Sequence, residues 1–527
     1  MGVNFEHNAI KPTMSVYNGI ALVATMMIGS GVFIIPAIVV AKVQSIGMAI
    51  ILWFVVAFIS ACGSNSFVEL GMMFPKSGGA LTYLAYSFKK PKFLVSFVFC
   101  ITQILVIWPA MIASELDATS KQLLYNVETT PWLIKLSSVI LLTIIVLINF
   151  FSVDFAMKLS TGLTYIKFYT LYAMCIAGVF AYCGISVNPI AKNVVYFDKP
   201  STNPSDYASA VFKLLWVWDG WNNLNYAIEE MVEPKRDFPR AVFGGVGITG
   251  ILYLLTNFFF ITIVPYDQIL TSDLSIASVY CKIIFGEFIG QKMVPFLIFL
   301  SCYATTDNMV YGVSRIIHAA SRSRIVPFHT TFSKLDENRG TPRNALIYTW
   351  AISAFLILMP FSDHAFEFFL QMAIYPKWIF YSLAVIGLLY LRWSEPFFVR
   401  PVKSYIFCSV VLIIASIFLA IFPLMGSDMV PSVISLGVMA LSAMLYFVMR
   451  KQVVQADFGF DDEVEHKLND ACDIESSHSI YSDSKSNGNK SKDSRDLKDT
   501  IYSEVGDYQF VSEPGSVVPS RPSTMEK

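Results

Sequence analysis

The sequence has few charged residues for its length. Only 15% of its 527 residues are Asp, Glu, Lys or Arg, whereas soluble domains carry about 25%. Acidic and basic residues nearly balance, and the formal net charge is −1. The chain therefore has no overall positive field that would attract nucleic acid, and we expect no nucleic-acid partner.

Cysteine and histidine are also scarce, at eight and six residues. They form no cluster with the spacing of a zinc site, so we expect no metal and no cofactor. The cysteines lie mostly in apolar segments without the spacing of a disulfide framework, which favours small buried side chains. The short polar segment 1–13 lacks the apolar stretch of a secretory signal peptide, so the first apolar segment is expected to direct insertion.

Long apolar runs fill most of the chain. The composition is 55% hydrophobic and the mean hydropathy is +0.57. Because a helix needs about 20 apolar residues to cross a bilayer, we predict an all-α membrane protein with about twelve spans. This excludes a soluble enzyme. The predicted spans are 14–40, 46–68, 93–116, 133–151, 161–184, 207–230, 241–264, 292–319, 344–360, 364–391, 402–424 and 430–450.

Lysine and arginine are distributed unevenly between the predicted loops. One set of loops, at 76–92, 235–240, 322–343 and 392–403, carries most of them, and the opposite set carries far fewer. Positively charged loops stay in the cytoplasm, so we expect both termini to be cytoplasmic. Residues 451–527 are rich in Ser, Asp, Glu and Lys, a composition that predicts a disordered cytoplasmic tail.

The first apolar segment contains a break at Ile28, Gly29, Ser30 and Gly31. Glycine lets the backbone unwind, and the freed N–H groups lie at the positive N-terminal end of the following half-helix. That arrangement suits a carboxylate. The alternative is close helix packing through small residues.

A second break lies within residues 216–223, which read WVWDGWNN. Carbonyls unwound at Trp216, Val217 and Asp219, next to Gly220, can accept hydrogen bonds from a substrate ammonium group. Such breaks persist in a bilayer only where they line a cavity or a substrate, and two in corresponding places indicate a transport site. The alternative for the tryptophans is an aromatic belt at the membrane interface.

Two charged residues lie deep in predicted spans. Lys167 needs backbone carbonyls or similar partners, and we predict that it braces the first span against the eighth where other transporters hold sodium. The alternative is a lysine that reaches the membrane surface. Asp307 is a carboxylate at membrane depth and a functional candidate. Asp307 couples transport to protons, or it is ionised, faces the substrate and favours cationic substrates, or it packs between helices with nearby hydroxyls as partners.

Several stretches resemble the amino acid–polyamine–organocation superfamily, and within it the L-type amino-acid transporter branch. They are IGSGVFIIP (28–36), VELGMMFPKSGGALTYL (68–84), YIKFYTLYAM (165–174), WVWDGWNNLNYAIEEMVEPKRDFPRAV (216–242) and VSRIIHAASRSRIVPF (313–328). A further stretch, KKPKFLVSF (89–97), is similar to fungal methionine permeases of that branch.

The resemblance implies a LeuT-like inverted repeat of five plus five spans, at 14–184 and 207–391, with two additional helices at 402–450. It implies that Gly29, Ser30 and Gly31 bind the substrate carboxylate and that the Met27 carbonyl meets the ammonium group. It also assigns Trp216 to the gate, the Asp219 backbone to the ammonium group, and Lys167 to the lysine that replaces a sodium site.

The sequence departs from the family pattern in three places. Ala80 replaces a glutamate, Asp307 stands where relatives often have Asn, and the loop 117–132 has no Cys. The last difference argues against the disulfide-linked heavy chain of animal members.

The function favoured by these observations is a plasma-membrane permease for neutral L-amino acids, with methionine as a candidate. The alternatives are a carrier of cationic amino acids or polyamines, favoured by Asp219 and Asp307, and a non-transporting nutrient sensor.

Overall fold

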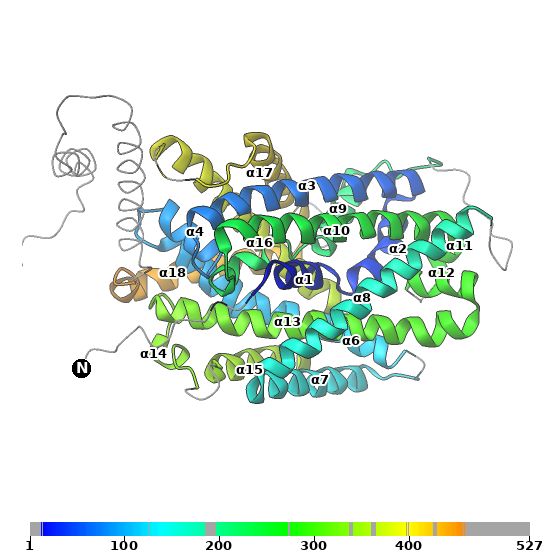
Figure 1. The fold of residues 1–527 in the computed structure, drawn as a ribbon, viewed down its shortest axis with the longest axis horizontal. Coiled ribbons are helices and arrows are strands. Elements are labelled where there is room, and N and C mark those ends of the chain that lie inside the picture. Colours follow the sequence, from blue (N-terminus) through cyan, green and yellow to red (C-terminus); the bar gives the residue numbers. More distant parts are fainter. Residues whose placement is uncertain are drawn as a thin grey trace, which may run out of the picture. The chain divides into compact units, whose positions relative to one another are not determined.

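A computed structural model gives the fold of the chain (Figure 1). It describes residues 12, 14–125, 127–184, 197–271, 275–336, 341–359, 365–396, 398, 400–424, 429–456 and 458. The described part is helical apart from an isolated bridge between Met14 and Met231. The predicted N-terminal segment, apart from residue 12, and the predicted tail beyond residue 458 lie outside the described residues.

Ten described helical segments are long and apolar enough to cross a membrane. In chain order they are Val16–Val43 (α1, Val16–Met27, and α2, Gly31–Val43), Ile46–Met73 (α3), Leu94–Leu123 (α5, Leu94–Phe99, η2, Cys100–Ile107, and α6, Trp108–Leu123), Pro131–Phe151 (α7), Phe155–Tyr182 (within α8, Val153–Tyr182), Pro234–Ile263 (α10), Ile289–Arg322 (η5, Ile289–Met293, and α13, Val294–Arg322), Phe368–Ser394 (within α16, Ala365–Ser394), Ile406–Leu424 (α17, Ile406–Ile421, and η6, Phe422–Leu424) and Val430–Val453 (α18). The chain is an integral, multi-pass membrane protein.

Two predicted spans correspond to shorter helices, α9 (Pro204–Val217) and α15 (Arg343–Leu358). The segment predicted as one span at 207–230 ends as an α-helix at Val217 and continues in two short 3-10 turns, η3 (Asn223–Tyr226) and η4 (Ile228–Glu230). Neither helix reaches the usual spanning length. Within the described residues ten helical segments meet the length and apolarity criterion, and the predicted count of about twelve spans is not confirmed.

One further helix begins earlier than predicted. The helix of the fifth predicted span, 161–184, begins at Val153, because the Ser152 side chain caps it by accepting from the Phe155 N–H. The segment 265–291 lies between the seventh and eighth predicted spans. It contains α11 (Tyr266–Thr271) and α12 (Ile276–Phe285), and most of α12 is buried.

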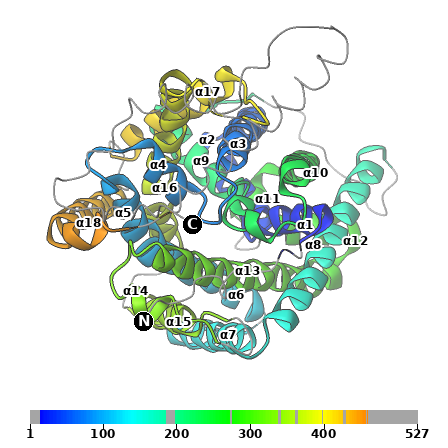
Figure 2. The same ribbon diagram turned by 60° about the vertical axis from the view of Figure 1, so that its left-hand side comes forward.

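Contacts between the two halves of the chain occur in matched pairs. The α1·α10 contact matches α3·α9, the α6·α16 contact matches α8·α13, and α6 contacts its own counterpart α13. In a five-plus-five repeat, each pair is the image of the other. Figure 2 shows α13 and α6 near the middle of the bundle, with α15 and α7 beyond them. This arrangement is consistent with the predicted LeuT-like fold.

Prolines inside the spans free backbone carbonyls, and neighbouring helices supply donors for them. Pro376 has no N–H for the carbonyl of Met372, and the Ser435 hydroxyl of α18 donates to it at 2.8 Å. Pro109 likewise frees the Leu105 carbonyl, which accepts from the Tyr348 hydroxyl at 2.9 Å. Such rescue by side chains lets broken helices persist in a bilayer.

The last two spans lie at the edge of the helical bundle (Figure 2). In each of these two spans, α17 and α18, only 22% of the most apolar stretch is buried inside the structure. Their exposed side chains are large and apolar, including Ile414, Leu441 and Phe447. A water-soluble monomer rarely exposes such continuous apolar surface, so these faces fit contact with lipid.

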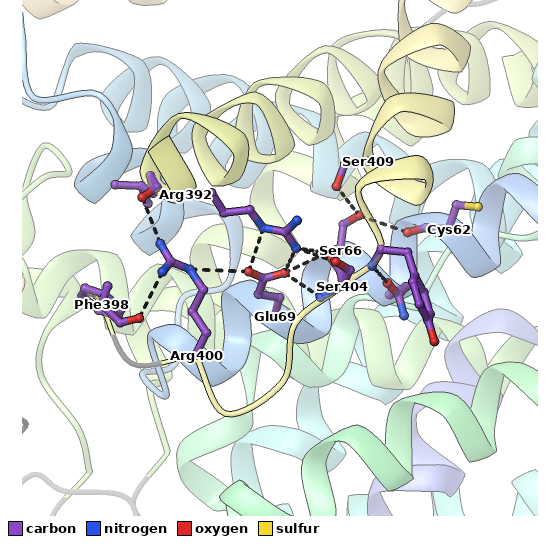
Figure 3. Close-up of polar contacts among 11 residues, drawn as sticks. Cys62, Ser66, Glu69, Arg392, Phe398, Arg400, Ser404 and Ser409 are labelled. Carbon is purple, nitrogen blue, oxygen red and sulfur yellow. Dashed lines mark hydrogen bonds and ion pairs between the residues drawn. The ribbon is translucent and has the colours of Figure 1, made fainter. Parts of the chain in front are cut away.

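A buried charge cluster joins the end of α3 to the α16–α17 connection (Figure 3). Glu69 is fully buried, and its carboxylate accepts from Arg392 Nη2 and, at 3.0 Å, from Arg392 Nε. The Ser404 N–H and hydroxyl donate to the same carboxylate at 2.7 and 2.8 Å, and Arg400 Nε lies 3.6 Å away.

Arg400 also closes the end of α16. It donates to the carbonyls of Leu391 and Glu395, both at 2.9 Å, where the last carbonyls of the helix have no partner within it. Burial lowers the pKa of Arg400, and the Glu69 carboxylate opposes that shift. The cluster therefore holds together α3, α16 and the α16–α17 connection at this end of the bundle.

Candidate functional site: two helix breaks around one cavity

The two predicted helix breaks contact each other. Gly220 has φ +104°, and a Cβ there would lie 3.0 Å from the Met26 carbonyl carbon. A Cβ on Gly31 would lie 2.8 Å from both Trp216 Cζ3 and Val217 Cγ2. Only glycine at these positions allows such a close approach, because any side chain would push the two breaks apart.

A cavity of about 530 Å³, including its open mouth, lies where the breaks meet. Seven predicted site residues line it: Met27, Gly29, Gly31, Trp216, Val217, Asp219 and Gly220. Ile28 and Ser30 belong to the break but are not among the lining residues.

The second break turns most of its aromatic side chains away from the cavity. Trp218 packs against Trp53 and Tyr253, with ring centroids 6.2 and 5.3 Å apart. Trp221 is fully buried against Phe67 and other rings. Of the three tryptophans at 216, 218 and 221, only Trp216 lines the cavity.

Lys167 lies between α1 and α13. Its ammonium group donates to the Thr25 carbonyl at 3.2 Å, to the Ile28 carbonyl at 2.7 Å and to the Thr305 hydroxyl at 2.6 Å. These partners satisfy carbonyls that the break in α1 has released. The side chain is buried and bridges the first and eighth predicted spans, as the sequence predicts.

The carbonyl of Met27, the last residue of α1, also has a hydrogen-bond donor inside the protein. The Tyr253 hydroxyl of α10 donates to the Met27 carbonyl. The Met27 carbonyl also accepts from the Gly29 N–H at 3.1 Å, so both of its lone pairs have donors inside the protein. Its assignment to the ammonium group stays a prediction.

Glu115 is a site residue that sequence reasoning missed. Its carboxylate accepts from the Ser30 N–H and from the Ser30 hydroxyl, each at 3.1 Å. It lies on α6, just beyond the π-helical segment η2, and such segments often mark functional sites. An internal carboxylate therefore occupies one of the donors that the sequence assigns to the substrate carboxylate, the Ser30 N–H.

Lys377 is the second residue that was missed. It lines the cavity from α16, and its ammonium group donates to Asp219 Oδ2. The signal was a lysine well inside an apolar run, since a charge at membrane depth is a functional candidate. The Asp219 side chain thus contacts α16, and the backbone contact of Asp219 with the substrate stays a prediction.

Asp307 lies on α13 outside the cavity lining. Its Oδ1 accepts from the Asn149 amide of α7 at 2.6 Å. Within the described residues Asp307 has no ion-pair partner. Its predicted role in proton coupling remains untested.

A second cavity continues from the first and shares Met26, Trp108 and Asn223 with it. Its far end is lined by Glu230 and Arg315, whose charged atoms lie 3.8 Å apart. The arginines at 236 and 240, on the nearby α10, contact the acids Glu233 and Asp237.

The comparison with protein families decides the class of this site. The profile of the amino acid permease family matches residues 15–449, most of the chain. The chain belongs to the amino acid permease family. It is a transporter rather than an enzyme, and its expected affiliation with the amino acid–polyamine–organocation superfamily and the L-type branch is confirmed.

Individual relatives are amino acid transporters at moderate identity. The permease is 25% identical to the b(0,+)-type amino acid transporter 1 of Rattus norvegicus over 423 residues, which cover 80% of this chain and 84% of the relative. It is 28% identical to the human cystine/glutamate transporter over 407 residues, 76% of this chain and 78% of the relative. It is 26% identical to the human large neutral amino acids transporter small subunit 2 over 444 residues, 84% and 81% of the two chains.

Proposed function

We propose that this permease carries neutral L-amino acids across the plasma membrane by alternating access, with methionine as the first candidate. The observation that carries the proposal is the meeting of two opposite helix ends at one cavity. Helix α2 begins at Gly31 and helix α9 ends at Val217, and both residues line the cavity.

Those helix ends complement the two charges of an amino acid. The N-terminus of a helix carries partial positive charge and free N–H groups, and the C-terminus carries partial negative charge and free carbonyls. The substrate carboxylate lies at the Gly29–Gly31 turn, and its ammonium group lies at the carbonyls of Trp216 and Val217. To reach the Ser30 N–H, the carboxylate must displace Glu115.

The remaining wall of the cavity favours an apolar, unbranched side chain. It is lined by Met26, Met111, Met309 and Trp108. Methionine side chains adapt to irregular ligands, and sulfur makes favourable contacts with aromatic rings. A thioether side chain fits such a lining. The relatives whose names mention large neutral amino acids are compatible with this substrate class.

Access alternates between the two sides of the cavity. The second cavity, toward Glu230 and Arg315, provides one route, and Trp216 gates the other. We expect Lys167 to take the place of a sodium ion and Asp307 to couple uptake to protons. Both termini face the cytoplasm. No disulfide-linked heavy chain is required.

The test is uptake of labelled methionine by the permease in a transport-deficient host. Neutral amino acids in excess should reduce the labelled uptake, and spermidine should not. Stronger inhibition by lysine or spermidine than by unlabelled methionine would favour the cationic carrier. A protein that reaches the membrane but gives no uptake of any amino acid would favour a non-transporting sensor.

A further inference from the structure

The ion pair between Asp219 and Lys377 joins the second helix break to α16. Lys377 and Tyr381 are one helical turn apart, so they project from one face of α16. Lys377 donates to one Asp219 oxygen, and the Tyr381 hydroxyl lies 3.4 Å from the other. Both oxygens of the Asp219 carboxylate therefore face α16.

This pair is removed from water yet lies at the substrate cavity. The side chains of Lys377 and Asp219 are 7% and 13% exposed, and both residues line the cavity. A charge removed from water is costly unless a partner compensates it. Each of the two side chains is the compensating partner of the other, and loss of either would leave the remaining charge uncompensated beside the substrate.

The other charges at this cavity are already engaged. Among the described lining residues, the ionisable ones are Glu115, Asp219 and Lys377. The Glu115 carboxylate accepts from Ser30, and the nearby Lys167 ammonium group donates to the Ile28 carbonyl. With Asp219 paired to Lys377, all three charged groups of the lining have partners in this structure.

We propose that Lys377 sets the charge specificity of the permease by neutralising Asp219. This inference rests on the proposed function and names the determinant of its substrate class. Without Lys377, Asp219 faces the cavity as an unpaired carboxylate and attracts lysine, arginine or a polyamine. Without the Asp219 charge, Lys377 attracts an amino acid with an anionic side chain. Uncharged side chains are preferred only while both charges are present.

The experiment compares uptake of labelled methionine, lysine and glutamate by the wild type and three variants. Lys377→Met keeps a linear side chain of similar length without the charge. It should raise the ratio of lysine to methionine uptake at least tenfold. Asp219→Asn should raise the ratio of glutamate to methionine uptake instead. The double variant Asp219→Asn with Lys377→Met should show neither gain.

Surface labelling of each variant separates altered specificity from poor folding. Unchanged ratios in both single variants at the cell surface would overturn the inference, as would the same lysine gain in the double variant. In the wild type, excess lysine and glutamate should leave methionine uptake unchanged, and this arm stands even where a variant fails to fold. Equal uptake of lysine and methionine by the wild type would refute this inference and the neutral substrate class, but not amino-acid transport itself. Absence of all amino-acid uptake would refute the proposed function.

Discussion

Replacing Gly31 with alanine should separate the two helix breaks. The added Cβ would lie 2.8 Å from Trp216 Cζ3 and 2.8 Å from Val217 Cγ2. Distances below 3.0 Å are essentially never seen for real Cβ atoms, so one of the breaks must shift. Gly31 is the first residue of α2 and has an ordinary helical backbone, so the alanine itself fits its conformation. The whole effect therefore comes from the contact between the breaks.

The size of the effect follows from the cost of overpacking, which is about 1–3 kcal/mol for extra atoms in a well-packed core. If that cost falls on the arrangement that binds substrate, its population drops by about 5- to 150-fold, at about 1.4 kcal/mol for each factor of ten. Uptake at low substrate concentration should fall by the same factor, while expression at the cell surface stays near normal.

The assay is uptake of labelled methionine at a substrate concentration well below saturation, normalised to surface protein. Gly247→Ala is the matched control, because Gly247 lies within α10 and a Cβ there would meet no heavy atom within 4 Å. It should transport like the wild type. Uptake by Gly31→Ala within twofold of the control would refute the argument that close approach of the breaks forms the site.

Three further outcomes are expected. Uptake should be unchanged when choline replaces sodium, and a strict sodium requirement would contradict the role of Lys167 in place of a sodium ion. Lys167→Ala should be inactive at any substrate concentration, because α1 and α13 lose their shared partner. Asp307→Asn should flatten the dependence of uptake on external pH while uptake continues, since an amide cannot carry the proton, and an unchanged pH profile would reduce Asp307 to a packing residue. Glu69→Gln should cost about 3–5 kcal/mol of stability, measured by thermal unfolding in detergent, because it leaves buried guanidinium groups without their carboxylate. The control Lys89→Ala removes the ion pair between Glu395 and a largely exposed lysine and should cost at most about 1 kcal/mol. Equal losses of stability in the two variants would show that the buried cluster contributes no more than an exposed pair.

The helix breaks could be predicted from the sequence because each has a local signature. Glycines within an apolar run, as at Gly29 and Gly31, or beside an aspartate, as at Gly220, have few explanations in a bilayer other than a ligand or a cavity. Lys167 was predictable for the same reason, since a buried ammonium group in a span must find carbonyls. The all-helical class follows from the long apolar runs alone.

The partners of the breaks could not be predicted, because they depend on distant contacts. Asp219 and Lys377 are 158 residues apart in the chain, and no local pattern indicates that α16 turns its lysine toward α9. Glu115 was missed for a different reason. The third span was predicted to end at residue 116, which put Glu115 at the membrane surface, whereas α6 continues to Leu123.

The central claim is that the cavity between the breaks recognises the two charged groups of an amino acid. Competition against labelled methionine uptake by methionine, its methyl ester and the decarboxylated amine tests it most directly, because the three compounds share one side chain. We predict that methionine competes fully, whereas the ester and the amine, which lack the anionic carboxylate, compete at least tenfold more weakly. Equal competition by all three would contradict carboxylate recognition at the Gly29–Gly31 turn.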